Sequence, residues 1–77
     1  MSIEKKLAKH IKELRAEREI TQSVLAELSG IEYKHIQALE SMKNTHSPTL
    51  RTLEKLSKAF DLELWEFLKP ITQKKKK

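Results

Sequence analysis

The segment QSVLAELSGIEYKHIQALES, residues 22–41, decides the fold of this chain. Apolar residues recur at helical spacing on both sides of Gly30, which predicts two short helices at about residues 22–29 and 33–42. Gly30 supplies the left-handed backbone that a tight corner needs, and Ala26 is small enough for two helices to cross closely. The expected apolar anchors are Leu25, Ile31, Ile36 and Leu39, and Leu28 is also expected to face inward. The segment therefore predicts a helix-turn-helix, although an ordinary helical hairpin has the same pattern.

The flanking sequence predicts three further helices, which makes the expected fold all-α with five helices. Apolar stripes indicate one helix at about residues 3–17, one that begins at Pro48 with the stripe Leu50, Leu53, Leu56 and Phe60, and one at about residues 63–69. Good N-cap residues precede the first, second and fourth helices, namely Ser2, Thr21 and Ser47. Because proline interrupts helical hydrogen bonding, Pro70 is expected to end the fifth helix. We therefore expect one domain, residues 1–70, followed by a disordered basic tail, residues 71–77.

Composition limits the possible functions. The net charge of the 77 residues is +5, but without the terminal run Lys74–Lys77 there are 12 basic and 11 acidic residues. Bulk charge alone therefore does not predict a nucleic-acid binder. The chain has no cysteine, no apolar run near the ~18 residues of a membrane span and no signal-peptide pattern, which fits a cytoplasmic protein.

Signals for catalysis or metal binding are weak. The three histidines, His10, His35 and His46, share no metal-ligand spacing, and the sequence has neither a phosphate-binding loop nor a nucleophile constellation. We therefore expect no enzyme activity, no cofactor and no metal site.

Two long segments resemble the XRE family, also called the lambda-repressor-like or Cro/C1-type helix-turn-helix family. They are LAKHIKELRAEREITQSVLAELSGIEYKHIQALE and SPTLRTLEKLSKAFDLELWEFL, which together span most of residues 7–68. The pair Thr21-Gln22, the turn Gly30-Ile31, the pair Leu39-Glu40 and the run from Pro48 occur in family order. The resemblance implies a five-helix DNA-binding domain that binds palindromic operators as a homodimer.

The chain departs from the family pattern at two places. The family usually has serine or threonine as the cap of the recognition helix, whereas Glu32, a poor cap, stands here. The family often continues with glycine after the position of Glu40, whereas this chain has Ser41-Met42 and a slightly longer stretch to Pro48. These differences affect the first turn of the recognition helix and the shape of the loop that follows it.

The outer face of residues 33–41 is the candidate for reading bases in the major groove. Gln37 can donate to and accept from adenine, and Lys34 can donate to guanine. Ala38 and the ring of Tyr33 can contact a thymine methyl group, and Glu32 can accept from cytosine. For each residue the alternative is a solvated surface side chain.

Phosphate contacts are expected on both sides of that helix. By resemblance, Gln22 binds backbone phosphate with help from Ser23 and from the free N–H groups at the start of its helix. The stretch after the recognition helix contributes further candidates, Ser41, Lys43, Asn44, Thr45 and His46. Lys74–Lys77 can add weak, sequence-independent contacts, although a solubilising tail is the simpler interpretation.

The resemblance implies one structural ion pair and one region of dimer contact. Arg15 pairs with Glu40, largely buried, and so ties the first helix to the end of the third; the alternative is that Arg15 binds phosphate. Trp65 exceeds what a single apolar stripe of the last helix needs, and with Leu68 it is expected in a dimer interface.

The sequence as a whole predicts a homodimeric transcriptional regulator, a repressor, with double-stranded DNA as its partner and no membrane. A phage-type repressor, the controller protein of a restriction-modification system and an antitoxin that autoregulates its operon remain open; an antitoxin would also have a protein partner. The rival from another class is a protein-interaction module without DNA binding, which the near-neutral domain and Glu32 allow.

Overall fold

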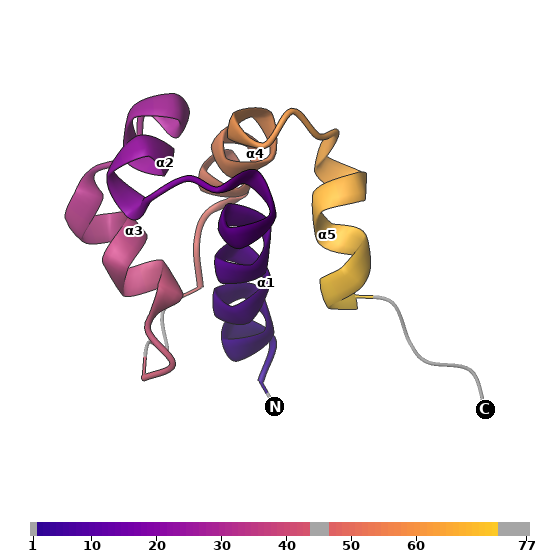
Figure 1. Cartoon of the computed structure of the whole chain (residues 1–77). Helices are drawn as coiled ribbons and strands as arrows, with labels where there is room; N and C mark the ends of the chain where they lie inside the picture. Colours follow the sequence, from indigo (N-terminus) through magenta and orange to yellow (C-terminus); the bar gives the residue numbers. More distant parts are fainter. Residues whose placement is uncertain (1, 44–46, 73–77) are drawn as a thin grey trace.

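The computed structural model describes residues 2–43 and 47–72, and over these residues the chain forms helices joined by turns. The helices are α1 (Ile3–Arg18), α2 (Gln22–Ser29), α3 (Tyr33–Glu40), α4 (Leu50–Ala59) and α5 (Leu64–Thr72). Figure 1 shows α1 between the α2–α3 pair and α5. Contacts of α1 with α3 and α5, and of α4 with α2 and α5, enclose the core. The expected five-helix all-α fold is confirmed.

The core is built from the apolar stripe of each helix. Its buried members are Leu7, Ile11, Leu14, Leu25, Ile31, Ile36, Leu39, Leu56, Phe60, Phe67 and Ile71. All four expected anchors of the helix-turn-helix lie among them, but the expectation that Leu28 faces inward is wrong, because Leu28 is 58% exposed. The inward side of α2 is formed by Leu25, Ala26 and Ser29, and Leu28 projects from the flank of that stripe.

Helix ends follow the expected capping chemistry at three places. The N-caps Ser2 and Thr21 accept hydrogen bonds from the N–H groups of Lys5 and Val24, at 3.2 and 3.1 Å. Gly30 ends α2 with φ of 73°, and its N–H donates to the Ala26 carbonyl at 2.9 Å. The capping predictions for α1 and α2 are therefore confirmed.

Two helices end on left-handed residues that are not glycine. Glu19 after α1 and Asp61 after α4 have φ of 55° and 59°. In each case the next N–H reaches back five residues, from Ile20 to Arg15 at 3.1 Å and from Leu62 to Ser57 at 2.8 Å. The two turns place Ile20 and Leu62 against the core.

These left-handed positions allow a matched stability test. Gly30→Ala is expected to lower the free energy of unfolding by about 1 kcal/mol, because a Cβ atom is disfavoured in this backbone region. A Cβ at Gly30 would meet no atom within 4 Å, so the loss isolates the backbone effect. Glu19→Gly should raise the free energy of unfolding by up to about 1 kcal/mol, because glycine has no Cβ atom. The greater freedom of glycine in the unfolded chain offsets part of this gain. Urea unfolding measures both; an unchanged Gly30→Ala variant would contradict the argument.

The start of α4 differs from the expected one. The helix begins at Leu50 rather than at Pro48, and its N-cap is Thr49, whose hydroxyl accepts from the N–H of Thr52 at 3.1 Å. Ser47, the expected cap, instead donates its hydroxyl hydrogen to the Glu4 carboxylate at 2.8 Å. Leu50, the first residue of the helix, is 69% exposed and therefore does not belong to the buried stripe that the sequence predicted for it.

The end of α5 was also predicted wrongly. Proline inside a helix removes one hydrogen bond, but the helix continues past Pro70 to Thr72. Ile71 is buried in the core, and the hydroxyl of Thr72 donates to the Leu68 carbonyl at 3.1 Å. Burial of Ile71 thus offsets the lost bond, and the packed part of the chain extends beyond residue 70. Residues 73–77, the remainder of the predicted tail, lie outside the described residues.

Candidate nucleic-acid interface

Buried apolar side chains anchor both helices and the turn of the helix-turn-helix segment to the core. Leu25 from α2 and Ile36 and Leu39 from α3 are buried. In the turn, Ile31 is buried and its N–H donates to the hydroxyl of Ser29 at 3.2 Å. Because both helices and the turn are fixed to the core, the outer face of α3 is held in a defined orientation.

That outer face is free of other described parts of the chain. The side chains expected to read bases, Tyr33, Lys34, Gln37 and Ala38, are all exposed. Ile36, Leu39 and Glu40 occupy the opposite, buried side. The structure therefore separates the eight residues of α3 into one face that packs and one face that can meet a ligand. α3 ends at Glu40, two residues before the predicted end, with Ser41 as its C-cap.

Glu32 lies at the start of this face without capping the helix. It occupies the N-cap position of α3 and makes no side-chain cap hydrogen bond. Its carbonyl accepts the first helical bond, from the N–H of Ile36 at 3.0 Å. The carboxylate is exposed and so remains able to accept a hydrogen bond from a partner.

The start of α2 presents a cluster of hydrogen-bond donors. Thr21 uses its hydroxyl and carbonyl for the N–H groups of Val24 and Leu25, so those of Gln22 and Ser23 have no partner within the helix. Ser23 is exposed, and Gln22 is half-buried with its side-chain amide 3.2 Å from Glu40 Oε1. The positive end of a helix with unpaired N–H groups is a favourable place for a phosphate.

The segment after α3 is only partly described. Ser41 is half-buried, and its hydroxyl accepts from the N–H of Lys43 at 3.2 Å, which orders the first residues of the loop. Lys43 is exposed. The other predicted phosphate contacts here, Asn44, Thr45 and His46, lie outside the described residues.

Arg15 and Glu40 lie in direct contact beneath the interface. The Glu40 side chain is 1% exposed, and its two carboxylate oxygens accept from Arg15 Nε at 2.6 Å and Nη2 at 2.7 Å. Arg15 Nη1 donates to the carbonyl of Ile20 at 3.1 Å, and the hydrogen bonds to Glu40 raise the pKa of the guanidinium above its ordinary value. The bidentate pair joins α1 to the end of α3. The sequence did not reveal that Gln22 and Ile20 share this network, because only the folded chain brings them together.

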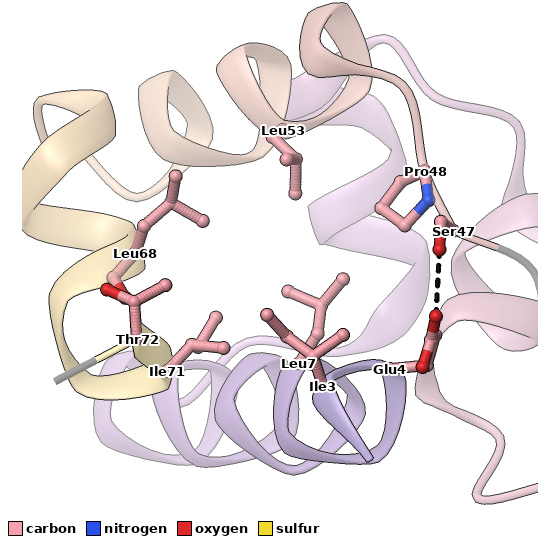
Figure 2. A pocket seen from close by; sticks show the side chains of 9 residues that line it. All are labelled: Ile3, Glu4, Leu7, Ser47, Pro48, Leu53, Leu68, Ile71 and Thr72. Carbon is pink, nitrogen blue, oxygen red and sulfur yellow. Dashed lines mark hydrogen bonds between the residues drawn. The ribbon is translucent and has the colours of Figure 1, made fainter. Parts of the chain in front are cut away.

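Trp65 and Leu68 lie on α5, away from the α2–α3 pair (Figure 1). Trp65 is 64% exposed, whereas Leu68 is partly buried at the edge of an apolar groove of about 230 Å³. Figure 2 shows this groove between α1, the segment before α4, α4 and α5. Its lining includes Ile3, Leu7, Pro48, Leu53, Leu68 and Ile71, and the Glu4–Ser47 hydrogen bond closes one side. That bond lowers the pKa of Glu4.

His10 packs α1 against α5. Its ring lies 5.2 Å from that of Phe67, centroid to centroid, and its buried Nε2 has no hydrogen-bond partner among the described residues. Burial lowers the pKa of His10 below its ordinary value of 6.5, against smaller opposing effects of the Phe67 backbone and of Glu13 and Glu17. The folded state therefore favours neutral His10.

A lowered histidine pKa predicts that acid destabilises the fold. Since the unfolded chain binds the proton more tightly, the stability linked to His10 is complete above pH 6.5 and decreases as the pH falls below that value. His10→Leu should flatten the pH dependence of unfolding, whereas His35→Gln, a change at an exposed site of α3, should leave the slope in place. Urea unfolding between pH 5 and 8 measures both; an equal slope in the His10→Leu variant would contradict the assignment.

Within residues 2–43 and 47–72, no group of three or more His, Asp or Glu residues is arranged to hold a metal ion. None of the helices described is both long and apolar enough to cross a membrane.

Comparison with known proteins agrees with the helix-turn-helix geometry. A family model described as helix-turn-helix matches residues 11–67, a span that contains all of α2, α3 and α4. No curated protein and no solved structure matched the chain. The matched span covers most of the 77 residues, and the resemblance seen in the sequence is confirmed. The chain therefore belongs to the Cro/C1-type helix-turn-helix family, or XRE family, of DNA-binding transcription regulators.

Proposed function

We propose that this regulator is a repressor that binds a palindromic operator as a homodimer and inserts α3 into the major groove of double-stranded DNA. The observation that carries the proposal is the exposed face of α3, which presents Lys34 and Gln37 from a helix anchored by Ile36 and Leu39. The major groove of B-DNA admits one helix and presents a different pattern of donors and acceptors for each base pair. A rigidly held helix with free polar side chains matches that requirement.

The exposed side chains have distinct proposed roles. Gln37 binds an adenine edge and Lys34 a guanine edge, while Ala38 and the Tyr33 ring contact thymine methyl groups. Glu32 accepts a hydrogen bond from cytosine at the start of the helix. The spread of these residues over about two helical turns, from the N-cap to the last turn of α3, supports reading several successive base pairs.

The phosphate contacts are proposed to flank this face. Gln22 and Ser23, with the free N–H groups at the start of α2, bind one backbone strand. Ser41 and Lys43, and the loop residues Asn44, Thr45 and His46, bind on the other side of the groove. Such contacts set the register of the protein on the duplex and supply much of its affinity.

Titration of the native chain with random-sequence duplex DNA at low and high salt tests the central proposal. A protein that neutralises phosphates loses affinity steeply as salt rises. A protein-interaction module, the alternative that the near-balanced charge of the domain allows, would show no binding and therefore no salt dependence. Selection of bound sites from random DNA would then give the operator and show whether it is palindromic.

The homodimer is proposed to form through α5. Trp65 is a large exposed aromatic side chain beside Leu68, and buried aromatic anchors dominate the energy of protein interfaces. A two-fold interface would set the two copies of α3 about 34–36 Å apart, one turn of DNA.

Replacing the anchor tests the dimer. Trp65→Ser is expected to weaken dimerisation by about 30-fold or more, the effect of losing about 2 kcal/mol at an interface hot spot. Tyr33→Ser, which removes the exposed aromatic side chain of α3, is the matched control and should dimerise like the native chain. Sedimentation equilibrium measures both; a native chain that stays monomeric, or equal dimerisation of all three proteins, would rule out this interface.

Three biological roles share this chemistry: a phage-type repressor, the controller of a restriction-modification system, and an autoregulating antitoxin with a protein partner. All three meet DNA in the cytoplasm, which is the proposed location. The neighbouring genes distinguish them, since a nuclease and methyltransferase, a toxin or phage genes would each identify one role.

A further inference from the structure

The Glu40 carboxylate is the point where three parts of the helix-turn-helix domain meet. It accepts from Arg15 Nε at 2.6 Å, from Arg15 Nη2 at 2.7 Å and from Gln22 Nε2 at 3.2 Å. Arg15 lies on α1, Gln22 is the first residue of α2, and Glu40 is the last residue of α3. The ion pair therefore extends by one hydrogen bond to a residue at the proposed DNA surface.

This bond fixes the orientation of the Gln22 amide. A carboxylate only accepts hydrogen bonds, so the NH₂ group of Gln22, and not its carbonyl oxygen, must face Glu40. An NH₂ group carries two hydrogens that point in different directions, and Glu40 engages one of them. The second hydrogen remains available from a half-exposed side chain beside the unpaired N–H groups of Gln22 and Ser23.

Charge balance makes this arrangement compatible with a phosphate. A buried carboxylate on its own would repel a phosphate that approaches the start of α2. The two hydrogen bonds from Arg15 neutralise Glu40 and leave the carboxylate as an oriented acceptor. The pair can therefore direct Gln22 without repelling its ligand.

We infer that Glu40 is a positioning residue for DNA binding, which holds the Gln22 amide so that its second N–H donates to a backbone phosphate. The inference rests on the proposed function, and it adds to a structural role for the Arg15–Glu40 pair. Ordering the Gln22 side chain before DNA arrives removes the entropy cost of immobilising it on binding, an advantage of about 2- to 10-fold in affinity. The Arg15–Glu40 ion pair and the phosphate contact of Gln22 are then coupled in DNA affinity.

A double-mutant cycle in DNA affinity tests the coupling. Gln22→Ala is made in the native chain and in the Arg15→Met/Glu40→Leu background, from which both buried charges are removed together. In the native chain we expect Gln22→Ala to weaken binding about 10-fold or more, as for a hydrogen bond to a charged group. In the background the same change should cost about 3-fold or less, because the amide is no longer oriented.

The outcomes of the cycle separate this inference from the proposed function. Equal losses in the two backgrounds would overturn positioning by Glu40 and leave the Gln22 phosphate contact in place. If Gln22→Ala leaves the DNA affinity of the native chain unchanged, Gln22 makes no phosphate contact, and the inference is overturned. Absence of DNA binding by the native chain at any salt concentration would overturn the proposed function.

Should the background variant fail to fold, the side-chain amide signals of the native chain decide the question by NMR. Gln22 is expected to show NH₂ protons that are shifted from random-coil values and protected from exchange with water, and one of the two should shift when duplex DNA is added. Gln37, exposed on α3, is the internal control and should show random-coil NH₂ shifts and fast exchange before DNA is added. Random-coil shifts and fast exchange for Gln22 in the free protein would overturn the inference.

Discussion

Arg15→Ala is expected to lower the free energy of unfolding by about 3–5 kcal/mol, because it leaves the Glu40 carboxylate buried without its partner. Glu40 is 1% exposed and has two of its three hydrogen bonds from Arg15. A small domain has a total stability of about 5–15 kcal/mol, so this single change should bring the chain close to unfolding. Urea unfolding at neutral pH, followed by circular dichroism, measures the loss.

Two further variants distinguish the cost of leaving the buried Glu40 carboxylate unpaired from the cost of simply removing an arginine. Arg18→Ala removes a second arginine of α1, which donates to the Phe60 carbonyl at 2.9 Å, and should cost only about 1 kcal/mol. Arg15→Met/Glu40→Leu should recover most of the loss, since replacing both members of a buried pair by apolar residues is often neutral. If Arg15→Ala unfolds like the native chain but no longer binds DNA, Arg15 is a phosphate contact and the structural interpretation is wrong.

The second large effect concerns recognition. The variant Lys34→Ala/Gln37→Ala is expected to lose about 2–6 kcal/mol of discrimination between the selected operator and random DNA, since each bidentate base contact contributes about 1–3 kcal/mol. Both side chains are exposed, so the variant should fold like the native chain. Fluorescence anisotropy with the operator and with a scrambled duplex at one salt concentration measures the ratio.

Lys43→Ala is the matched control because it removes a charge at a proposed phosphate contact. It should weaken binding to both duplexes equally and reduce the dependence of the affinity on salt. Discrimination that survives in the Lys34→Ala/Gln37→Ala variant would mean that α3 is not the element that reads the bases. An equal loss on both duplexes would reassign these two residues to the phosphate backbone.

Local chemistry explains where sequence reasoning succeeded. The start and end of α2 were predictable because Thr21 and Gly30 act on their own neighbours in the chain. The same reasoning was wrong at the start of α4, where Ser47 and Thr49 are both acceptable caps and a contact between Ser47 and Glu4 selects the second. The predicted end of α5 at Pro70 was also wrong. The local preference of proline does not show that Ile71 is buried in the core, and the helix continues past it.

The five helices, the glycine corner and the exposed face of α3 were predictable from the amino-acid sequence, because periodicity and backbone preference are properties of neighbouring residues. The hydrogen bond that joins Gln22 to the Arg15–Glu40 pair, and the exposure of Leu28 and Leu50, became apparent only from the packing of the helices. These features depend on which helices cross and at what register. That information is held by the whole packed core and not by any stretch of chain within it.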